Sequence, residues 1–319
     1  MKIIYITGCL GFIGSYITKL LLDQGHYVRG IDKITYAANL DILKEFTKYD
    51  KFIFEHKDIT DIEFLYDCDY IINVAAETHV GNSIVKSDEF IKSNIYGVQN
   101  ILELLRNYRQ ENQITPRLIH FSTDEVYGDI LSGEHTETDL LKPSNPYSAT
   151  KAAADMLIQA WSRTYGIDYT IIRPTNNYGI GQYIEKLIPK TCKYLSLGRK
   201  IPLHNHGKPV RNWLHVKDTA NSVDTILKNH DQSRNQIYNV CGGFEQDNLT
   251  TVTQIIHAYF QKTNININDY IDFSYNRSGQ DFRYSLNDQK LQNLGWKAIE
   301  IFNHSLLSIV EYYKNKFIW

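Results

Sequence analysis

Three glycines near the start of the chain place the strongest restriction on its fold. Gly8, Gly11 and Gly14 directly follow a strand-like segment at 2–7 and open an amphipathic stretch at 12–24. Glycines at this spacing let the backbone turn tightly and approach a pyrophosphate, while the N-terminus of the following helix faces the negative charge. The pattern therefore predicts a strand–turn–helix unit that binds a dinucleotide.

The rest of the first half alternates short β-branched runs with longer amphipathic stretches, which is typical of a parallel sheet. Further strands are predicted at 27–31, 52–56, 70–74, 118–122 and 169–172, with a long helix at 147–165. We expect an α/β fold, a Rossmann-type doubly wound parallel sheet over residues 1–173. Prolines and glycines interrupt the pattern after Arg173, so residues 174–319 are expected to form mainly a smaller, irregular C-terminal substrate lobe. Part of 211–240 is expected to return to the first domain.

The composition excludes several classes of protein. Hydrophobic residues make up 43% and charged residues 22% of the 319 residues, which is typical of a globular protein with a packed core. The formal net charge of -2 gives no electrostatic signature for binding nucleic acid or an anionic membrane. No apolar run reaches the roughly 20 residues that a membrane span needs. The four cysteines are far apart without a CxxC motif, which favours reduced thiols and a cytoplasmic location.

The residue that ends the second predicted strand indicates which dinucleotide binds. Asp32 lies about 20 residues after the glycines, where a carboxylate accepts both ribose hydroxyls and repels a 2′-phosphate. This favours NAD over NADP. The neighbouring Lys33 weakens the argument slightly, since a lysine could pair with such a phosphate. Asp58 and Ile59, after the third predicted strand, would suit the adenine edge.

Tyr147 and Lys151 open the long predicted helix and lie four residues apart, on one helix face. They can meet the same cofactor ribose. A lysine cation and a positive nicotinamide would lower the pKa of the tyrosine and make it a general base. A chance pair on a surface helix is the alternative in a chain with 23 tyrosines. Downstream of a dinucleotide motif, the catalytic interpretation is favoured.

With these two motifs the chain resembles the extended short-chain dehydrogenase/reductase family. Other segments resemble the dTDP-glucose 4,6-dehydratases, and the resemblance covers nearly the whole chain. These segments are 32–40, 75–80, 122–128, 146–152, 173–179, 185–189, 211–216 and 277–284. The resemblance implies an NAD-dependent hydro-lyase that acts on a nucleotide-activated glucose and supplies deoxysugar synthesis, as for rhamnose.

Thr123, Asp124 and Glu125 make the chain resemble the 4,6-dehydratases more than other members of the family. Epimerases and decarboxylases of the family generally lack the adjacent acid pair. The three residues follow a predicted parallel strand, where α/β sheets carry their chemistry. Eliminating water beside an oxidised sugar carbon needs an ionised base and a protonated acid, and two close carboxyl groups can have separate pKa values. By resemblance Glu125 is the C5 base and Asp124 the C6 acid. Solvated loop acids are the alternative.

The resemblance also implies a reaction cycle. Tyr147, supported by Lys151 and Thr123, takes the C4 hydroxyl proton while a hydride passes to NAD+. Water is then eliminated across C5 and C6, and the hydride returns to C6 to give a 4-keto-6-deoxy sugar. NAD is regenerated in every turn and can stay bound.

The resemblance further assigns two sets of binding residues. For NAD they are Gly8, Gly11, Phe12, Ile13, Gly14, Asp32, Lys33, Ile34, Thr35, Asp58, Ile59, Val74, Ala75, Ala76, Thr78, Ser93, Tyr147, Lys151 and Asn177. For the nucleotide sugar they are Thr78, Ser83, Thr123, Asn176, Lys186, Leu187, Pro202, Leu203, His204, Arg211, Asn248, Arg277 and Tyr284. Arg211 and Arg277 are the expected phosphate partners, because a guanidinium offers paired donors.

A metal site is not expected. His204 and His206, two apart on a strand, would share a face, but no third ligand is evident nearby.

Two features leave the nucleotide base open. Gly81 and Asn82 replace an Asp-Arg common in bacterial dTDP-glucose enzymes. Asn82 and the stretch 281–296 look nearer to the UDP-glucose 4,6-dehydratase part of plant rhamnose synthases. The choice between thymine and uracil depends on one methyl group, worth roughly 1–3 kcal/mol in a pocket.

Two other functions remain as alternatives, and a homodimer is expected. A UDP-sugar 4-epimerase would use Tyr147 and Lys151 but have no task for the acid pair, and a non-catalytic dinucleotide-sensing protein would typically lose the tyrosine or lysine. In the family, the helix with Tyr147 and one at 94–107 pair across a two-fold axis. The latter has apolar spacing at Ile95, Val98, Ile101, Leu102 and Leu105. Burial in the monomer would explain the same spacing.

Overall fold

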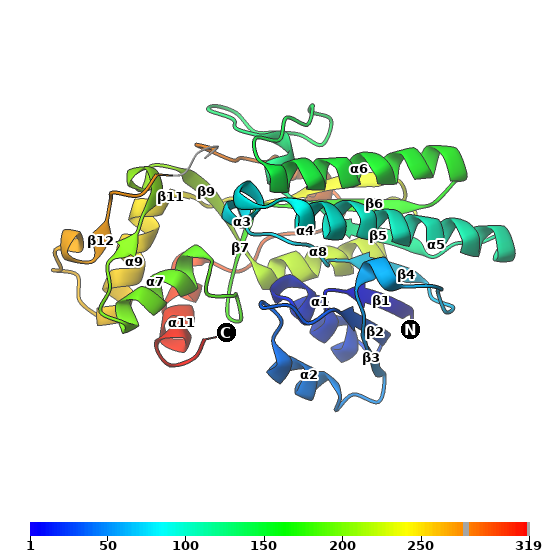
Figure 1. Ribbon diagram of the computed structural model, residues 1–319, viewed down its shortest axis with the longest axis horizontal. Coiled ribbons are helices and arrows are strands. Elements are labelled where there is room, and N and C mark those ends of the chain that lie inside the picture. The colour runs from blue at the N-terminus through cyan, green and yellow to red at the C-terminus, as the bar shows by residue number, and fades with distance from the viewer. Residues whose placement is uncertain (277–280, 318–319) are drawn as a thin grey trace.

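The central sheet of the computed structural model, which describes residues 1–276 and 281–317, has seven parallel strands (Figure 1). Their order is β3-β2-β1-β4-β5-β6-β10, so the chain reverses direction across the sheet between β1 and β4. Ligands of doubly wound sheets bind at this switch point, beyond the carboxyl ends of the strands. The strands are β1 (Ile3–Thr7), β2 (Tyr27–Asp32), β3 (Phe52–His56), β4 (Tyr70–Asn73), β5 (Arg117–Phe121), β6 (Tyr169–Pro174) and β10 (Gln236–Val240). The predicted fold class is confirmed.

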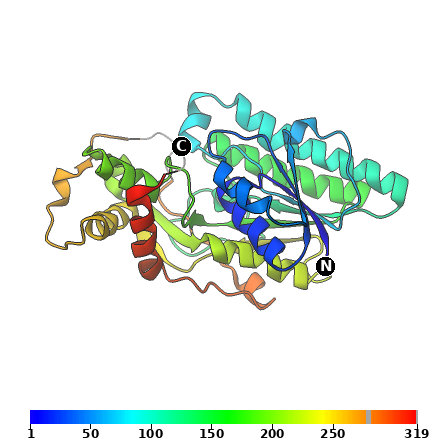
Figure 2. The same ribbon diagram turned by 90° about the horizontal axis from the view of Figure 1, so that it is seen from below.

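Helices cover both faces of this sheet. On one face α1 (Phe12–Asp23) contacts α8 (Val216–Lys228), and on the other α5 (Gly97–Asn112) contacts α6 (Pro146–Tyr165), as Figures 1 and 2 show. The shorter α2 (Leu40–Phe46), η1 (Ile59–Asp61), α3 (Val80–Val85), α4 (Asp88–Ile91) and η2 (Lys92–Tyr96) lie in the connections. The apolar stripe of α5 is buried in the core beneath it, so its spacing is accounted for within one chain.

A strong cap fixes where α6 begins. The Asn145 side chain accepts the backbone N–H of Ser148 at 2.9 Å, the Ser148 hydroxyl lies 3.2 Å from the Asn145 backbone N–H, and Pro146 occupies the first turn. Such a reciprocal cap satisfies donors that a helix start leaves unpaired. It places Tyr147 in the first turn of α6, at the carboxyl edge of the sheet.

The second half of the chain forms a smaller body at one end of the sheet (Figures 1 and 2). Its three-stranded sheet joins β7 (Asn176–Tyr178), β9 (Val210–His215) and β11 (Glu245–Asp247), and β8 (Ile201–Pro202) pairs with β12 (Ile271–Asp272). Around them lie α7 (Leu187–Ser196), η4 (His204–Gly207), α9 (Asn248–Phe260), η5 (Ile267–Asp269) and α11 (Phe302–Asn315). Between these segments β10 joins the first sheet and α8 packs against α1 on its face, and α10 (Gln289–Gln292) contacts β10.

Two local expectations differ from the structure. The predicted helix at 94–107 starts within the π-helical turn η2 before α5. His204 and His206 lie in the turn η4 rather than on a strand, because Asn205 and His206 adopt left-handed φ angles of 51° and 54°. The two imidazoles therefore do not share a strand face. No helix in the described ranges is long and apolar enough to cross a membrane.

Candidate active site

The glycine turn between β1 and α1 is packed too tightly for side chains. A Cβ on Gly14 would lie 2.0 Å from the carbonyl oxygen of Gly8, and Gly8 itself has a φ of 69°. A Cβ on Gly8 would lie 2.8 Å from the Cα of Ala75, beyond the end of β4. Because no side chain intervenes, the backbone N–H groups of this loop can come close to a ligand, as the binding of a pyrophosphate requires.

Asp32 ends β2 and is held by backbone donors from both sides. One carboxylate oxygen accepts the N–H of Leu10 at 3.0 Å and the other that of Ile34 at 2.8 Å. Burial raises the pKa of Asp32, and the two N–H groups oppose this shift. Ile34 adopts a φ of 53°, unusual for a branched residue, and presents its backbone to the carboxylate. Consistent with this, Ile34 does not line the adjoining pocket.

Lys33 is already engaged by carboxylates. Its ammonium lies 3.7 Å from Asp58 and 3.5 Å from Glu77, and it donates to the hydroxyl of Ser93 at 2.9 Å. A 2′-phosphate at this position would have to compete with two acids for one lysine. The acid Glu77, which was not predicted, is held in turn by Asn94, which accepts its backbone N–H at 2.9 Å.

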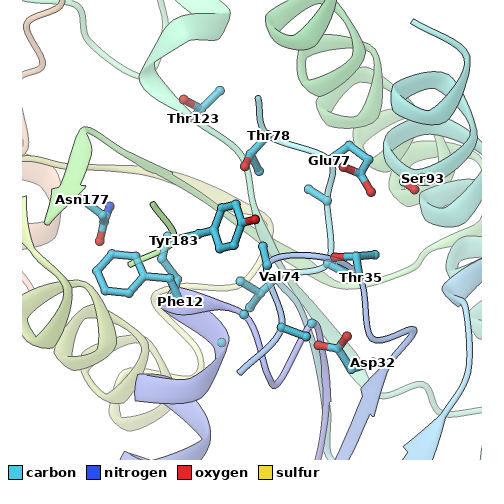
Figure 3. A pocket seen from close by; sticks show the side chains of 18 of the residues that line it. Phe12, Asp32, Thr35, Val74, Glu77, Thr78, Ser93, Thr123, Asn177 and Tyr183 are labelled. Carbon is cyan, nitrogen blue, oxygen red and sulfur yellow. The ribbon is translucent and has the colours of Figure 1, made fainter. Parts of the chain in front are cut away.

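A single pocket joins the glycine turn to the predicted catalytic residues. Figure 3 shows Asp32 and Thr35 toward one end, Thr123 and Asn177 toward the other, and Tyr183 between them. Every predicted NAD residue except Ile34 and Lys151 lines this pocket. The predicted residues Thr123, Asp124, Glu125, Asn176 and Lys186 line it as well.

Asp124 and Glu125 form the first turn of the short helix η3 (Asp124–Tyr127), directly after β5. The Thr123 hydroxyl accepts the N–H of Glu125 at 3.3 Å and donates to Asp124 at 3.0 Å. Burial, and then the neighbouring Glu125, raise the pKa of Asp124 to about 7. The second oxygen of Asp124 is buried without a hydrogen-bond partner in the described part of the chain. Asp124 is therefore suited to carry a proton near neutral pH.

Glu125 lies at the pocket wall and is less buried than Asp124. One of its carboxylate oxygens accepts the side-chain N–H of Asn145, the residue that caps α6, at 3.2 Å. Because the same asparagine positions Tyr147 in the first turn, the acid pair and the phenol are held by one local structure. Two adjacent acids in unequal surroundings are what acid–base catalysis of an elimination needs.

The protein groups around Tyr147 act on its pKa in the direction opposite to that expected of Lys151 and a nicotinamide cation together. Its pKa is raised rather than lowered, because burial and the Glu125 carboxylate outweigh a hydrogen bond with Thr123. Lys151, one turn along α6, donates to the carbonyl oxygen of Phe121 at 2.6 Å and is buried. Burial lowers the pKa of this lysine to about 8. The ammonium is thus directed toward β5 behind the phenol.

A buried ion pair lies beneath the acid pair. Asp155 of α6 accepts from Arg173 of β6 at 2.9 Å and from Ser122, which precedes Thr123, at 3.0 Å. Arg173 also donates to the hydroxyl of Tyr127, the last residue of η3, at 2.7 Å. Both charged side chains are almost wholly inaccessible, with 0% and 2% exposure. This ion pair, which the motifs did not reveal, holds both ends of the acid-bearing turn.

The predicted substrate residues that the structure describes divide into three groups. Those that line the pocket are Thr78, Thr123, Asn176 and Lys186. Ser83 lies behind it, where its hydroxyl accepts the Tyr147 backbone N–H at 3.2 Å. Away from the pocket lining, in the second lobe, are Leu187, Pro202, Leu203, His204, Arg211, Asn248 and Tyr284. Arg277 lies outside the described residues.

Arg211 influences the acid pair, which its expected role as a phosphate partner did not indicate. Its guanidinium donates to the backbone carbonyls of Val210 and Asp281 and lies 4.6 Å from the ring centre of Tyr284. Its charge is also among the influences that lower the pKa of Asp124. Arg211 therefore acts electrostatically on the acid pair as well as belonging to the second lobe.

Two further pocket residues, Tyr183 and Glu185, were not named as site residues by the sequence analysis. Tyr183 lies in an irregular stretch outside the resembling segments, and Glu185 begins the segment 185–189 without a role assigned to it. Tyr183 packs edge-on against Tyr36 with 5.1 Å between ring centres, and the adjacent Lys186 donates to the carbonyl of Thr78 at 3.2 Å. These contacts join the second lobe to loops of the first across the pocket.

A Rossmann-type sheet with a glycine turn at its switch point, and a tyrosine and lysine four apart beside it, defines an extended short-chain dehydrogenase/reductase. A family model described as GDP-mannose 4,6 dehydratase matches residues 5–306. The chain belongs to this family.

Comparisons with individual proteins narrow the similarity to particular enzymes. The chain is 36% identical to a dTDP-glucose 4,6-dehydratase of Haemophilus influenzae, over 98% of each protein. It is 34% identical to DesIV, a dTDP-glucose 4,6-dehydratase of Streptomyces venezuelae solved with NAD and TYD bound, with a TM-score of 0.90 over 98% of this chain and 97% of that one. A UDP-glucuronic acid 4-epimerase of Bacillus cereus has a TM-score of 0.89 over 98% and 99% of the two chains, but at 22% identity shares the fold alone.

Proposed function

We propose that the protein is an NAD-dependent dTDP-glucose 4,6-dehydratase that forms the 4-keto-6-deoxy sugar nucleotide. The observation that carries the proposal is the buried Asp124, with a pKa of about 7, beside Glu125 in the pocket that Tyr147 also lines. Membership of a 4,6-dehydratase family and full-length similarity to dTDP-glucose 4,6-dehydratases support it.

The residues at the glycine turn fit NAD. The tight turn offers backbone donors to a diphosphate, and Asp32 lines the pocket where ribose hydroxyls would lie. The pairing of Lys33 with Asp58 and Glu77 disfavours a 2′-phosphate and hence NADP. When bound there, NAD would supply the hydride acceptor for C4 and the hydride donor for C6.

The protein groups then move protons. Tyr147, which is hydrogen-bonded with Thr123, is proposed to take the C4 hydroxyl proton, with Lys151 one turn further along the same helix. Glu125 is proposed to remove the C5 proton. Asp124, protonated near neutral pH, is proposed to give its proton to the C6 hydroxyl as water leaves. A 4-epimerase would need Tyr147 but no such acid.

Product analysis with dTDP-glucose and UDP-glucose side by side tests the function and the choice of base. We expect loss of one water from dTDP-glucose, measured by mass spectrometry, and a slower reaction with UDP-glucose. Faster dehydration of UDP-glucose would reassign the base. An isomer of unchanged mass would indicate an epimerase, and no reaction with either sugar would contradict the proposal.

The raised pKa of Asp124 predicts the pH dependence of elimination. The acid works only when protonated, so activity should be greatest below its pKa of about 7 and decrease as the pH rises through that value. Well above it, the rate should fall by about tenfold per pH unit. The measurement is the pH profile of kcat for product formation with saturating sugar nucleotide. A rate that stays constant from pH 6 to 9 would contradict Asp124 as the acid.

Three further points belong to the proposal. Residues 1–173 with α8 and β10 would bind NAD, and the remainder would bind mainly the nucleotide sugar. A homodimer through α5 and α6 fits the 58% exposure of both Tyr96 and Met156, which project from this region. A cytoplasmic location fits four cysteines that are all free thiols.

A further inference from the structure

Lys151 ends a chain of buried polar groups that crosses three strands of the sheet. Its ammonium lies 3.4 Å from Nε2 of His120, and Nδ1 of His120 lies 3.0 Å from the side-chain nitrogen of Asn73. The Asn73 side-chain oxygen lies 2.5 Å from the Thr7 hydroxyl. Thr7, Asn73 and His120 are register partners on the adjacent strands β1, β4 and β5, and all are fully buried.

The far end of this polar chain lies at the wall of the cofactor pocket. The Thr7 hydroxyl accepts the backbone N–H of Ala75 at 3.3 Å, and Ala75 lines the pocket opposite the glycine turn. Thr7 is also the residue directly before Gly8. The row of buried polar groups therefore connects Lys151 to Thr7, the residue directly before the glycine turn, without passing through solvent.

A count of the protons shows that this row of polar side chains can form its hydrogen bonds in two ways. A neutral imidazole has one N–H and one lone pair, so His120 cannot accept from both Lys151 and Asn73. The pKa of His120 lies well below its usual range because of burial and the nearby Lys151, which keeps the ring neutral. A charged Lys151 must donate to Nε2, so the ring proton lies on Nδ1. The Asn73 amide must then be rotated by 180°, so that its oxygen accepts that proton. An uncharged Lys151 can instead accept from Nε2–H, with Nδ1 accepting from Asn73.

The two ionisation states of Lys151 thus require opposite tautomers of His120. When Lys151 is uncharged, its proton has been released to solvent and the His120 ring carries its proton on Nε2. Lys151 donates to the Phe121 carbonyl in either state. Among the described residues, the other ionisable group that acts on Lys151 is Asp155 on its own helix, which is paired with Arg173. Tyr147 lies four residues before Lys151 on the same helix.

We propose that His120 is a positioning residue for Lys151, and that its ring changes tautomer as the lysine gains or loses its proton. The change of tautomer alters the hydrogen bonds of Asn73 and Thr7, and Thr7 directly precedes the glycine turn. The role rests on the proposed function, because it matters to turnover only if Lys151 is catalytic.

The tautomer is measured directly by nitrogen NMR of histidine-labelled protein between pH 6 and 9.5. The His120 signals are assigned among the 11 histidines by their loss in His120→Gln. We expect the ring proton to move from Nδ1 to Nε2 with a midpoint near the Lys151 pKa of about 8, and this change to vanish in Lys151→Met. A ring that keeps one tautomer over the whole range would overturn the proposal. This readout needs no substrate, so it remains valid if the dehydratase assay fails.

Two substitutions test the effect on turnover. His120→Phe keeps the ring shape but removes both nitrogens, and we expect kcat to fall by about 10–100-fold, as for loss of a hydrogen bond to a charged group, with KM unchanged. His120→Gln places an amide near Lys151 and should recover most of the rate. Ile119→Val, on the same strand, controls for loosened packing and should keep nearly full activity. Wild-type kcat in a folded His120→Phe variant would contradict the role, as would equal losses in the Phe and Gln variants.

Discussion

Replacing Glu125 with glutamine is expected to abolish dehydration while leaving the protein folded. The change keeps the shape and the contact with Asn145 but removes the group proposed to take the C5 proton. Loss of a general base typically costs about 10²–10⁴-fold. The measurements are product formation by mass spectrometry and incorporation of solvent deuterium at C5 of the recovered sugar, and both should be lost.

Asp124→Asn is the matched variant, because it removes the proposed acid from the adjacent position. Water elimination should fall by a similar factor, but Glu125 remains able to exchange the C5 proton with deuterated solvent. The two variants therefore separate the base from the acid. Dehydration retained by Glu125→Gln would disprove the assigned base, and C5 exchange lost in Asp124→Asn but kept in Glu125→Gln would reverse the two roles.

Gly14→Ala is expected to impair both cofactor binding and folding. The added Cβ would lie 2.0 Å from the Gly8 carbonyl oxygen, so the backbone of the turn must move. Forcing atoms into a packed site costs about 1–3 kcal/mol, which corresponds to about 5–150-fold in affinity if the cost falls on binding. Calorimetric titration with NAD and thermal unfolding measure the two effects.

Gly11→Ala provides the comparison for this prediction. Among the described residues its Cβ would meet only the Gly8 oxygen, at 3.3 Å, so the turn should keep its shape and Tm should change little. NAD affinity should still fall, because Gly11 lines the pocket where the diphosphate is proposed to lie. Unchanged NAD affinity in Gly14→Ala would refute the proposed location of the cofactor.

The sequence predicted most of the first lobe because regular structure and ligand chemistry coincide there. The glycine turn, Asp32 and the tyrosine–lysine pair follow from spacing alone, and the structure brings all of them to one edge of the sheet. Thr123 to Glu125 follow a strand whose end is set by its apolar pattern, although their roles came from the resemblance to the 4,6-dehydratases and not from that pattern. Local patterns suffice where each functional group is fixed by the strand or helix that carries it.

Other features depend on contacts between distant segments and could not be predicted. Tyr183 reaches the pocket from an irregular segment, and its position is set by packing against Tyr36. The raised pKa of Tyr147 results from burial beside Glu125, which spacing along a helix does not indicate. His120 has no motif, and its importance follows only from its two neighbours in space, Asn73 and Lys151.

The Asp155–Arg173 pair constrains how this sequence can change. Each partner is buried, so loss of either one leaves an uncompensated charge at a cost of about 3–5 kcal/mol. Much of the stability of a typical domain would be lost in either single step. A double replacement by neutral residues avoids that cost, so the two positions should show strong energetic coupling. The two positions that hold the acid-bearing turn from α6 and β6 are therefore open to neutral substitution only as a pair.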